Sequence, residues 1–173
     1  MLLVGSASKS IDIVFKRLVI YSMLALLNAA LVTDLVVIAL SLTVFKSKTL
    51  TQWYREFGIG AVIADVLVLV LVVWLAHFLY QGNVFITACI AVGLQLTHDL
   101  LFAAFIQQYQ GKSPIFNVFK EYAKEHGASI LVADAMMVLS TVLLERIFSM
   151  SRYNEILSVF LVYLVPYFVF SVR

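Results

Sequence analysis

The feature that most constrains this chain is the return, five times in 173 residues, of an apolar run that is long enough, or nearly long enough, to cross a bilayer. A helix rises about 1.5 Å per residue, so about 20 apolar residues span the hydrocarbon core. The runs cover residues 18–45, 57–80, 84–106, 128–144 and 156–172. Helices satisfy their own backbone hydrogen bonds in lipid, and runs of this length are helical. The sequence therefore predicts an all-α, polytopic transmembrane bundle of about five spans, forming one membrane domain over residues 1–173.

The composition agrees with a membrane domain and argues against nucleic-acid binding. Hydrophobic residues make up 63% of the chain and charged residues 13%, which is far from the balance of a soluble domain. The net charge is only +2, and Lys and Arg fall between the apolar runs rather than on one basic face. For the N-terminal run the alternative is an interfacial helix, which would leave four spans.

The connection between the third and fourth spans, GKSPIFNVFKEYAKEHG, predicts a short helix on the membrane surface. Ser113 suits the N-cap, Pro114 suits the first helical position, and Gly127 suits the helix end. Apolar side chains recur at helical spacing, while most charges fall on other faces. We expect an interfacial amphipathic helix over residues 114–126, and a solvated connector is the alternative.

The basic residues indicate an orientation. We name the side of the membrane that holds residue 1 side A, and the opposite side B. Five basic residues fall on side A: Lys9, Lys16, Arg17, Arg146 and Arg152. Seven fall on side B: Lys46, Lys48, Arg55, Lys112, Lys120, Lys124 and Arg173. The positive-inside rule therefore favours side B, the side of the 112–126 segment, as cytoplasmic.

Four aspartates lie inside the apolar runs, one in each of the first four spans: Asp34, Asp65, Asp99 and Asp134. Their local strings are alike, but span plus loop also explains the spacing, so the spacing alone does not indicate duplication. Counted from side B, each lies about 9 to 16 Å deep. An aspartate at a helix centre costs about 2.5 to 3.5 kcal/mol on insertion scales. We therefore expect all four to face the bundle interior as one polar layer.

Four further residues are predicted to belong to this layer: Gln95, His98, Thr141 and Glu145. Gln95 lies one helical turn before Asp99, on the same face. Thr141 and Glu145 continue the stripe of the fourth-span aspartate, where polar and small side chains favour close helix packing. Consecutive residues point about 100° apart on a helix, so we expect His98 to reach a neighbouring helix rather than Asp99.

Aromatic and imidazole side chains near the ends of the second span predict interfacial positions. Trp53 and Tyr54 fit a belt of amphipathic rings on side B. His77 lies beside Trp74 and Tyr80 near side A, where an interfacial position is expected and a ligand role is not.

Four buried carboxyl groups leave three functions open. One is a proton or cation site on a permeation path. A second is structural, in which protonated or hydrogen-bonded carboxyls fix the helix register. The third is a metal-dependent membrane enzyme that uses the aspartates, His98 and Glu145 as ligands or acid-base groups, but no compact motif such as HExxH supports it. A non-enzyme is favoured, with no cofactor other than a cation at the aspartates.

Four segments stand out when they are read in order along residues 51–170: TQWYREFGIGAVIADVLVLVL, LQLTHDLLF, VFKEYAKEHGASILVADAMMVLSTVLL and VYLVPYF. Together they resemble an uncharacterised multi-span membrane protein family of large nucleocytoplasmic DNA viruses that infect algae and protists. The resemblance implies a viral integral membrane protein, in the internal membrane of the virion or in a virus-modified host membrane. It implies the lipid bilayer, further copies of the chain, or other viral membrane and capsid proteins as partners. It implies no activity or catalytic residue.

Overall fold

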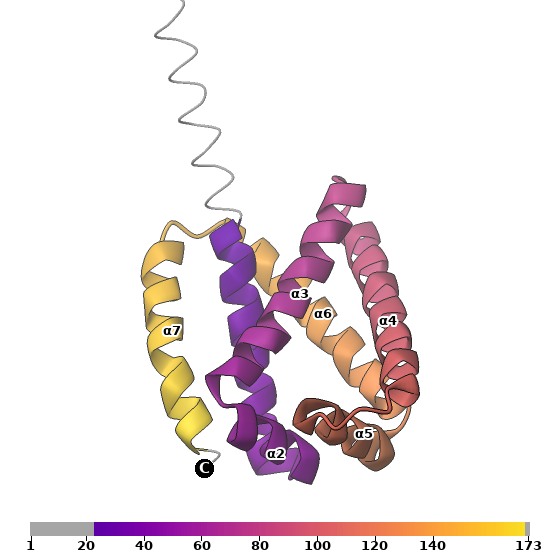
Figure 1. Cartoon of the computed structure of the whole chain (residues 1–173). Coiled ribbons are helices and arrows are strands. Elements are labelled where there is room, and N and C mark those ends of the chain that lie inside the picture. The colour runs from indigo at the N-terminus through magenta and orange to yellow at the C-terminus, as the bar shows by residue number, and fades with distance from the viewer. Residues whose placement is uncertain (1–22, 172–173) are drawn as a thin grey trace, which may run out of the picture.

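The computed structural model describes residues 23–171, and the secondary structure of this part of the chain is entirely helical. A long helix over residues 23–40 continues into the π-helical turn η1 (Ser41–Phe45). The helices that follow are α2 (Lys48–Phe57), α3 (Ile59–Leu79), α4 (Val84–Gln108), α5 (Pro114–His126), α6 (Ser129–Ser149) and α7 (Asn154–Ser171). The long helices run up and down beside one another, with α2 and α5 at the side-B end (Figure 1). The predicted all-α helical bundle is confirmed.

Four of the described helices are long and apolar enough to cross a membrane: Met23–Val44, α3, α4 and α7. A fifth span results if α5 and α6, which are bent by 103° at the break between them, are counted together. α6 alone is as long as α3, at 21 residues. It is not counted as a span by itself because it carries three charged residues, Asp134, Glu145 and Arg146. The described helices thus give the expected four or five spans. The N-terminal run, for which an interfacial helix was the alternative, is one of these candidates from Met23 to Val44, and its residues 18–22 lie outside the described part.

The connection around α5 follows its predicted signals. The Ser113 side chain accepts a hydrogen bond from the Phe116 amide, Pro114 occupies the first turn, and Gly127 ends the helix. A backbone N–H group in the first helical turn has no partner within the helix. Proline, which lacks this hydrogen, therefore starts a helix without loss of a hydrogen bond. The boundaries of α5 therefore match the predicted helix over residues 114–126.

The order of a long helix, a short side-B helix, a glycine and a second long helix occurs twice. Gly58 ends α2 with φ 56° and ψ −129°, and Gly127 ends α5 with φ 55° and ψ −133°. Both positions need a positive φ, which glycine adopts without a Cβ clash. Asp65 and Asp134 are each the seventh residue after their glycine. The same local geometry therefore delivers an aspartate to the same level of each following helix.

These two halves, residues 23–79 and 84–149, pack through equivalent elements. The short helices α2 and α5 contact each other, as do α3 and α6, and α3 also contacts α4. In the repeat, the equivalent of the contact between α3 and α4 is a contact between α6 and the first helix. There Thr141 Oγ1 donates to Thr33 Oγ1 at 3.2 Å. Both halves run in the same direction (Figure 1). This is the arrangement of a parallel repeat about an axis along the helices, with α7 added outside it.

A cluster of amide and hydroxyl groups fastens α7 to the first helix near side A. Asn28 Nδ2 donates to the Asn154 carbonyl oxygen at 3.0 Å, and Ser158 Oγ donates to Asn28 Oδ1 at 2.7 Å. Both asparagines are buried. Hydrogen bonds of this kind hold membrane helices together because the hydrophobic effect does not act between helices in lipid.

Candidate functional site: an acidic layer near side B

The side chains of Asp34 and Asp65 meet at the hydroxyl group of Tyr54. Tyr54 Oη lies 3.0 Å from Asp34 Oδ1 and 2.9 Å from Asp65 Oδ2. Trp53 Nε1 donates to the same Asp65 Oδ2 at 3.0 Å. The first helix, α2 and α3 each contribute to this cluster, which we name the Tyr54 cluster. One phenol thus connects carboxyl groups from two different long helices.

The prediction that Trp53 and Tyr54 form an aromatic belt on the membrane surface is wrong. Both side chains are buried, and Tyr54 is only 1% exposed. The backbone has a positive φ at Lys46 before α2 and at Gly58 after it, so the chain reverses at both ends of the short helix. α2 consequently lies against the bundle and directs its rings inward, which periodicity in the sequence does not reveal.

Burial raises the pKa of the Tyr54 phenol well above its usual range, and the nearby carboxyl groups of Asp65 and Asp34 raise it further. A phenolate at this place would be desolvated and repelled by two acidic groups. Tyr54 therefore keeps its proton at neutral pH and remains a hydrogen-bond donor.

Asp99 is bonded within its own helix. Gln95 Nε2 donates to Asp99 Oδ1 at 2.8 Å, and His98 Nδ1 lies 3.1 Å from the same oxygen. The expectation that His98 reaches a neighbouring helix rather than Asp99 is wrong, because the imidazole lies against the carboxyl group of Asp99 and the ring of Phe102 on its own helix. The imidazole is 43% exposed, against 13% for the Asp99 side chain, and it stacks on Phe102.

Asp134 makes no hydrogen bond with the described residues. Its carboxyl group lies within electrostatic range of Asp99 and Asp65, and Asp65 in turn lies within range of Asp34. Burial, followed by the charges of Asp134 and Asp65, raises the pKa of Tyr122 on α5 above its usual range. The structure therefore brings the four predicted aspartates together, and we name this group, with Gln95, the acidic layer.

Of the two α6 residues that were predicted in the same layer, Thr141 lies beside it and Glu145 lies apart from it. Thr141 bonds to Thr33, the residue directly before Asp34. Glu145 Oε2 lies 2.8 Å from His77 Nε2 near side A. Glu145 follows Asp134 by eleven residues, or about 16 Å along the helix. A shared stripe on α6 thus continues past the acidic layer to the other end of the bundle.

Three buried oxygen atoms have no hydrogen-bond partner within the described residues: Asp34 Oδ2, Gln95 Oε1 and Asp99 Oδ2. A buried acceptor left unsatisfied costs about 1 to 3 kcal/mol. Across residues 23–171, no group of three or more His, Cys, Asp or Glu side chains is arranged to hold a metal ion. The chemistry that the acidic layer offers is that of carboxyl groups and phenols, which bind and exchange protons.

A second polar cluster, which sequence analysis missed, joins the end of α5 to the start of α2. The Glu125 carboxylate accepts hydrogen bonds from Lys48 N at 3.1 Å, Thr49 N at 3.0 Å and Thr49 Oγ1 at 2.6 Å. His126 Nε2 lies 2.9 Å from Ser47 Oγ. The Thr49 hydroxyl, and then the two amides, lower the pKa of Glu125. A carboxylate here satisfies amides that a helix start leaves unpaired.

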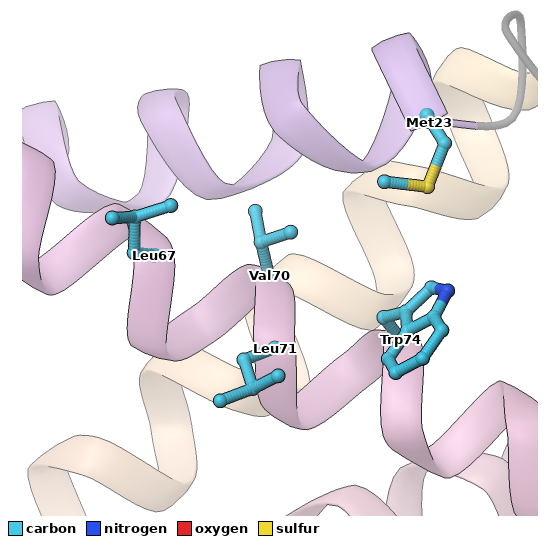
Figure 2. Close-up of a pocket in the computed structure, with 5 residues that line it drawn as sticks. All are labelled: Met23, Leu67, Val70, Leu71 and Trp74. Carbon is cyan, nitrogen blue, oxygen red and sulfur yellow. The ribbon is translucent and has the colours of Figure 1, made fainter.

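Two apolar hollows lie on the described surface, away from the acidic layer. Figure 2 shows the one between the start of the first helix and α3, which is lined by Met23, Leu67, Val70, Leu71 and Trp74. The other follows α7 and is lined by Ile156, Val159, Phe160 and Tyr163. Surfaces of this composition suit contact with acyl chains, and neither hollow adds polar chemistry to the site.

Comparison with known proteins gave no matching family model, no matching curated protein and no matching solved structure.

Proposed function

We propose that this chain is an integral membrane protein whose acidic layer fixes the packing of its helices and holds protons within the bilayer. The observation that carries the proposal is the position of the Tyr54 hydroxyl, within hydrogen-bond distance of Asp34 and Asp65 on two different long helices. A carboxyl group inside a membrane is costly. A hydrogen bond to Tyr54 offsets this cost for Asp34 and Asp65, and the same bonds hold the first helix and α3 together.

Replacement of single aspartates in protein reconstituted into liposomes tests this role. Asp65→Asn should keep the helix packing, because an amide oxygen still accepts from Tyr54 and Trp53. Asp65→Ala should lower the free energy of unfolding, because both donors lose their acceptor. If Asp65→Ala unfolds at the same denaturant concentration as the unmodified protein, the layer does not organise the bundle.

A second candidate function is conduction of protons or cations, with Asp99 at the outer end of the path. It is favoured by Asp34 Oδ2 and Asp99 Oδ2, which have no hydrogen-bond partner among residues 23–171, and by the exposed imidazole of His98. Liposomes loaded with a pH-sensitive or cation-sensitive dye distinguish the two functions. A flux that is lost in Asp99→Asn while the fold is retained would establish conduction. The absence of any flux under proton, Na⁺ and K⁺ gradients would exclude it.

The resemblance to proteins of large DNA viruses supports a proposed location in the virion's internal membrane or in a virus-modified host membrane. The excess of basic residues on side B supports a cytoplasmic side B. Further copies of the chain and other viral membrane or capsid proteins are the proposed partners besides lipid. Antibodies against residues 112–126, applied to infected cells after permeabilisation of the plasma membrane alone and after full permeabilisation, test both the location and the orientation. Labelling that appears only after full permeabilisation would contradict the proposed orientation.

A further inference from the structure

The Tyr54 cluster contains more hydrogen-bond contacts than its hydrogens can fill if both carboxyl groups are ionised. A phenol carries one hydroxyl hydrogen, and an ionised carboxylate only accepts. Yet Tyr54 Oη lies 3.0 Å from Asp34 Oδ1 and 2.9 Å from Asp65 Oδ2. With both aspartates ionised, one of these contacts would set two oxygen atoms against each other without a hydrogen between them. The geometry therefore requires one more proton.

The surroundings of the two carboxyl groups decide which of them holds it. Asp65 Oδ2 receives the Trp53 indole hydrogen at 3.0 Å in addition to its contact with Tyr54. Asp34 is 0% exposed, contacts Tyr54 through one oxygen, and has no partner for Oδ2 among the described residues. An unpartnered carbonyl oxygen of a neutral acid costs much less free energy than a buried, unpaired charge.

We propose that the Asp34 carboxyl group is a proton-binding site, in which the acid donates to Tyr54 Oη while the Tyr54 hydroxyl donates to ionised Asp65. This inference rests on the proposed function, since it names the group of the acidic layer that holds the proton. The bound ligand is a single proton. If both hydrogens shift together, Asp34 loses its proton to Tyr54 and Tyr54 passes its own to Asp65, so that the cluster keeps its hydrogen count and the negative charge moves to Asp34.

The second half of the molecule offers no equivalent relay. The residue four positions before Gly127 is Ala123, where the first half has Tyr54 four positions before Gly58. The only phenol on α5, Tyr122, makes no hydrogen bond to an aspartate within the described residues. Asp99→Asn is consequently a matched control, since it removes a carboxyl group of the acidic layer without touching the Tyr54 cluster.

Infrared spectroscopy of the full chain in liposomes, labelled with ¹³C-carboxyl aspartate, tests the site. A protonated carboxyl shows a carbonyl stretch separate from the bands of ionised carboxylates and of the amide backbone. At neutral pH, Asp34→Asn should remove the signal of one protonated carboxyl, whereas Asp65→Asn and Asp99→Asn should leave that signal in place. Loss of the signal in Asp65→Asn, or its persistence in Asp34→Asn, overturns the assignment.

Tyr54→Phe keeps the test decisive if Asp34→Asn does not fold. The acid then loses its acceptor, so its carbonyl band should remain and move to higher frequency. An unchanged frequency would show that Asp34 does not donate to Tyr54. The result is independent of helix packing strength, because a protonated Asp34 can be detected even where Asp65→Ala leaves the free energy of unfolding unaltered.

Discussion

The two halves of the molecule place their aspartates alike and bond them differently. In the first half, Asp34 and Asp65 share a hydroxyl supplied by the short helix α2. In the second half, the Asp99 partners both come from its own helix, and Asp134 has none among the described residues. The backbone at Gly58 and Gly127 is nearly the same.

The difference between the halves arises on the short helices rather than on the long ones. α2 turns Trp53 and Tyr54 inward, while α5 has Tyr122 and the exposed Ala123 at the corresponding positions. A repeated scaffold thus fixes where a carboxyl group lies, and one or two side chains outside the spans fix what it bonds to. The first half is therefore expected to be the more tightly fastened one.

The largest effect that distinguishes the halves should follow Tyr54→Phe. This change removes the group between two buried carboxyls and should lower the free energy of unfolding by about 3 kcal/mol. Denaturant titration in mixed micelles measures it. Tyr122→Phe is the matched control and should change the free energy by less than about 0.5 kcal/mol, because that hydroxyl has no hydrogen-bond partner in the described part. If Tyr54→Phe and Tyr122→Phe lowered the free energy of unfolding equally, the two halves would not differ in how their aspartates are bonded.

Trp53→Phe should cost about 1.5 kcal/mol, the value of one hydrogen bond to a charged group. The replacement ring keeps contact with Phe57 and Phe119, so the loss reports mainly on the bond to Asp65. Trp74→Phe, at an exposed position on the same bundle, serves as the comparison and should be close to neutral. A loss at position 74 as large as that at position 53 would indicate that ring size, not the hydrogen bond, matters.

Glu125→Gln should cost about 1 kcal/mol, as loss of a charged helix cap does, and it tests whether the second half holds α2 in place. Because folding lowers the Glu125 pKa from its ordinary value of 4.5, this stabilisation is present at and above neutral pH. It is lost as the pH falls below 4.5 and through the lowered value. The gap between the two unfolding free energies should therefore close in acid. Glu121→Gln, on the exposed side of α5, should show no gap at any pH.

Asp99→Asn should have the smallest effect, below about 0.5 kcal/mol. The amide still accepts from Gln95, and no other helix depends on the bond. The measurement is again the denaturant midpoint in micelles. A loss above about 1.5 kcal/mol would mean that the second half has a contact between helices equivalent to the Tyr54 cluster.

Local patterns in the sequence predicted much of this architecture. The lengths of the apolar runs predicted the long helices, and Ser113 and Gly127 predicted the two ends of α5. Both kinds of prediction succeed because they depend only on residues that are neighbours in the sequence. Helical rise also placed the four aspartates towards side B. The α6 stripe placed Glu145 wrongly in the acidic layer, since a helical face extends over the whole helix and does not indicate depth.

The partners of the aspartates were not predictable in the same way. Tyr54 reaches Asp34 only because backbone reversals at Lys46 and Gly58 turn α2 inward, and no periodicity shows such a turn at a lysine. A signal was present nonetheless: Glu56 and Glu125 stand two positions before their glycines, and an aspartate follows seven positions after each. This correspondence points to Trp53 and Tyr122 as equivalent positions near the acidic layer.

The Glu125 cap on α2 has a consequence for the order of assembly. Thr49 and Glu125 are 76 residues apart, and at ribosomal rates of about 5 to 20 residues per second roughly 4 to 15 s separate their synthesis. Asp34, Tyr54 and Asp65 all emerge within the first part of the chain and can meet before α5 exists. The amides of Lys48 and Thr49, at the start of α2, gain their acceptor only after Glu125 has been synthesised. Completion of the cap therefore marks the moment at which the later half of the protein docks onto the earlier one.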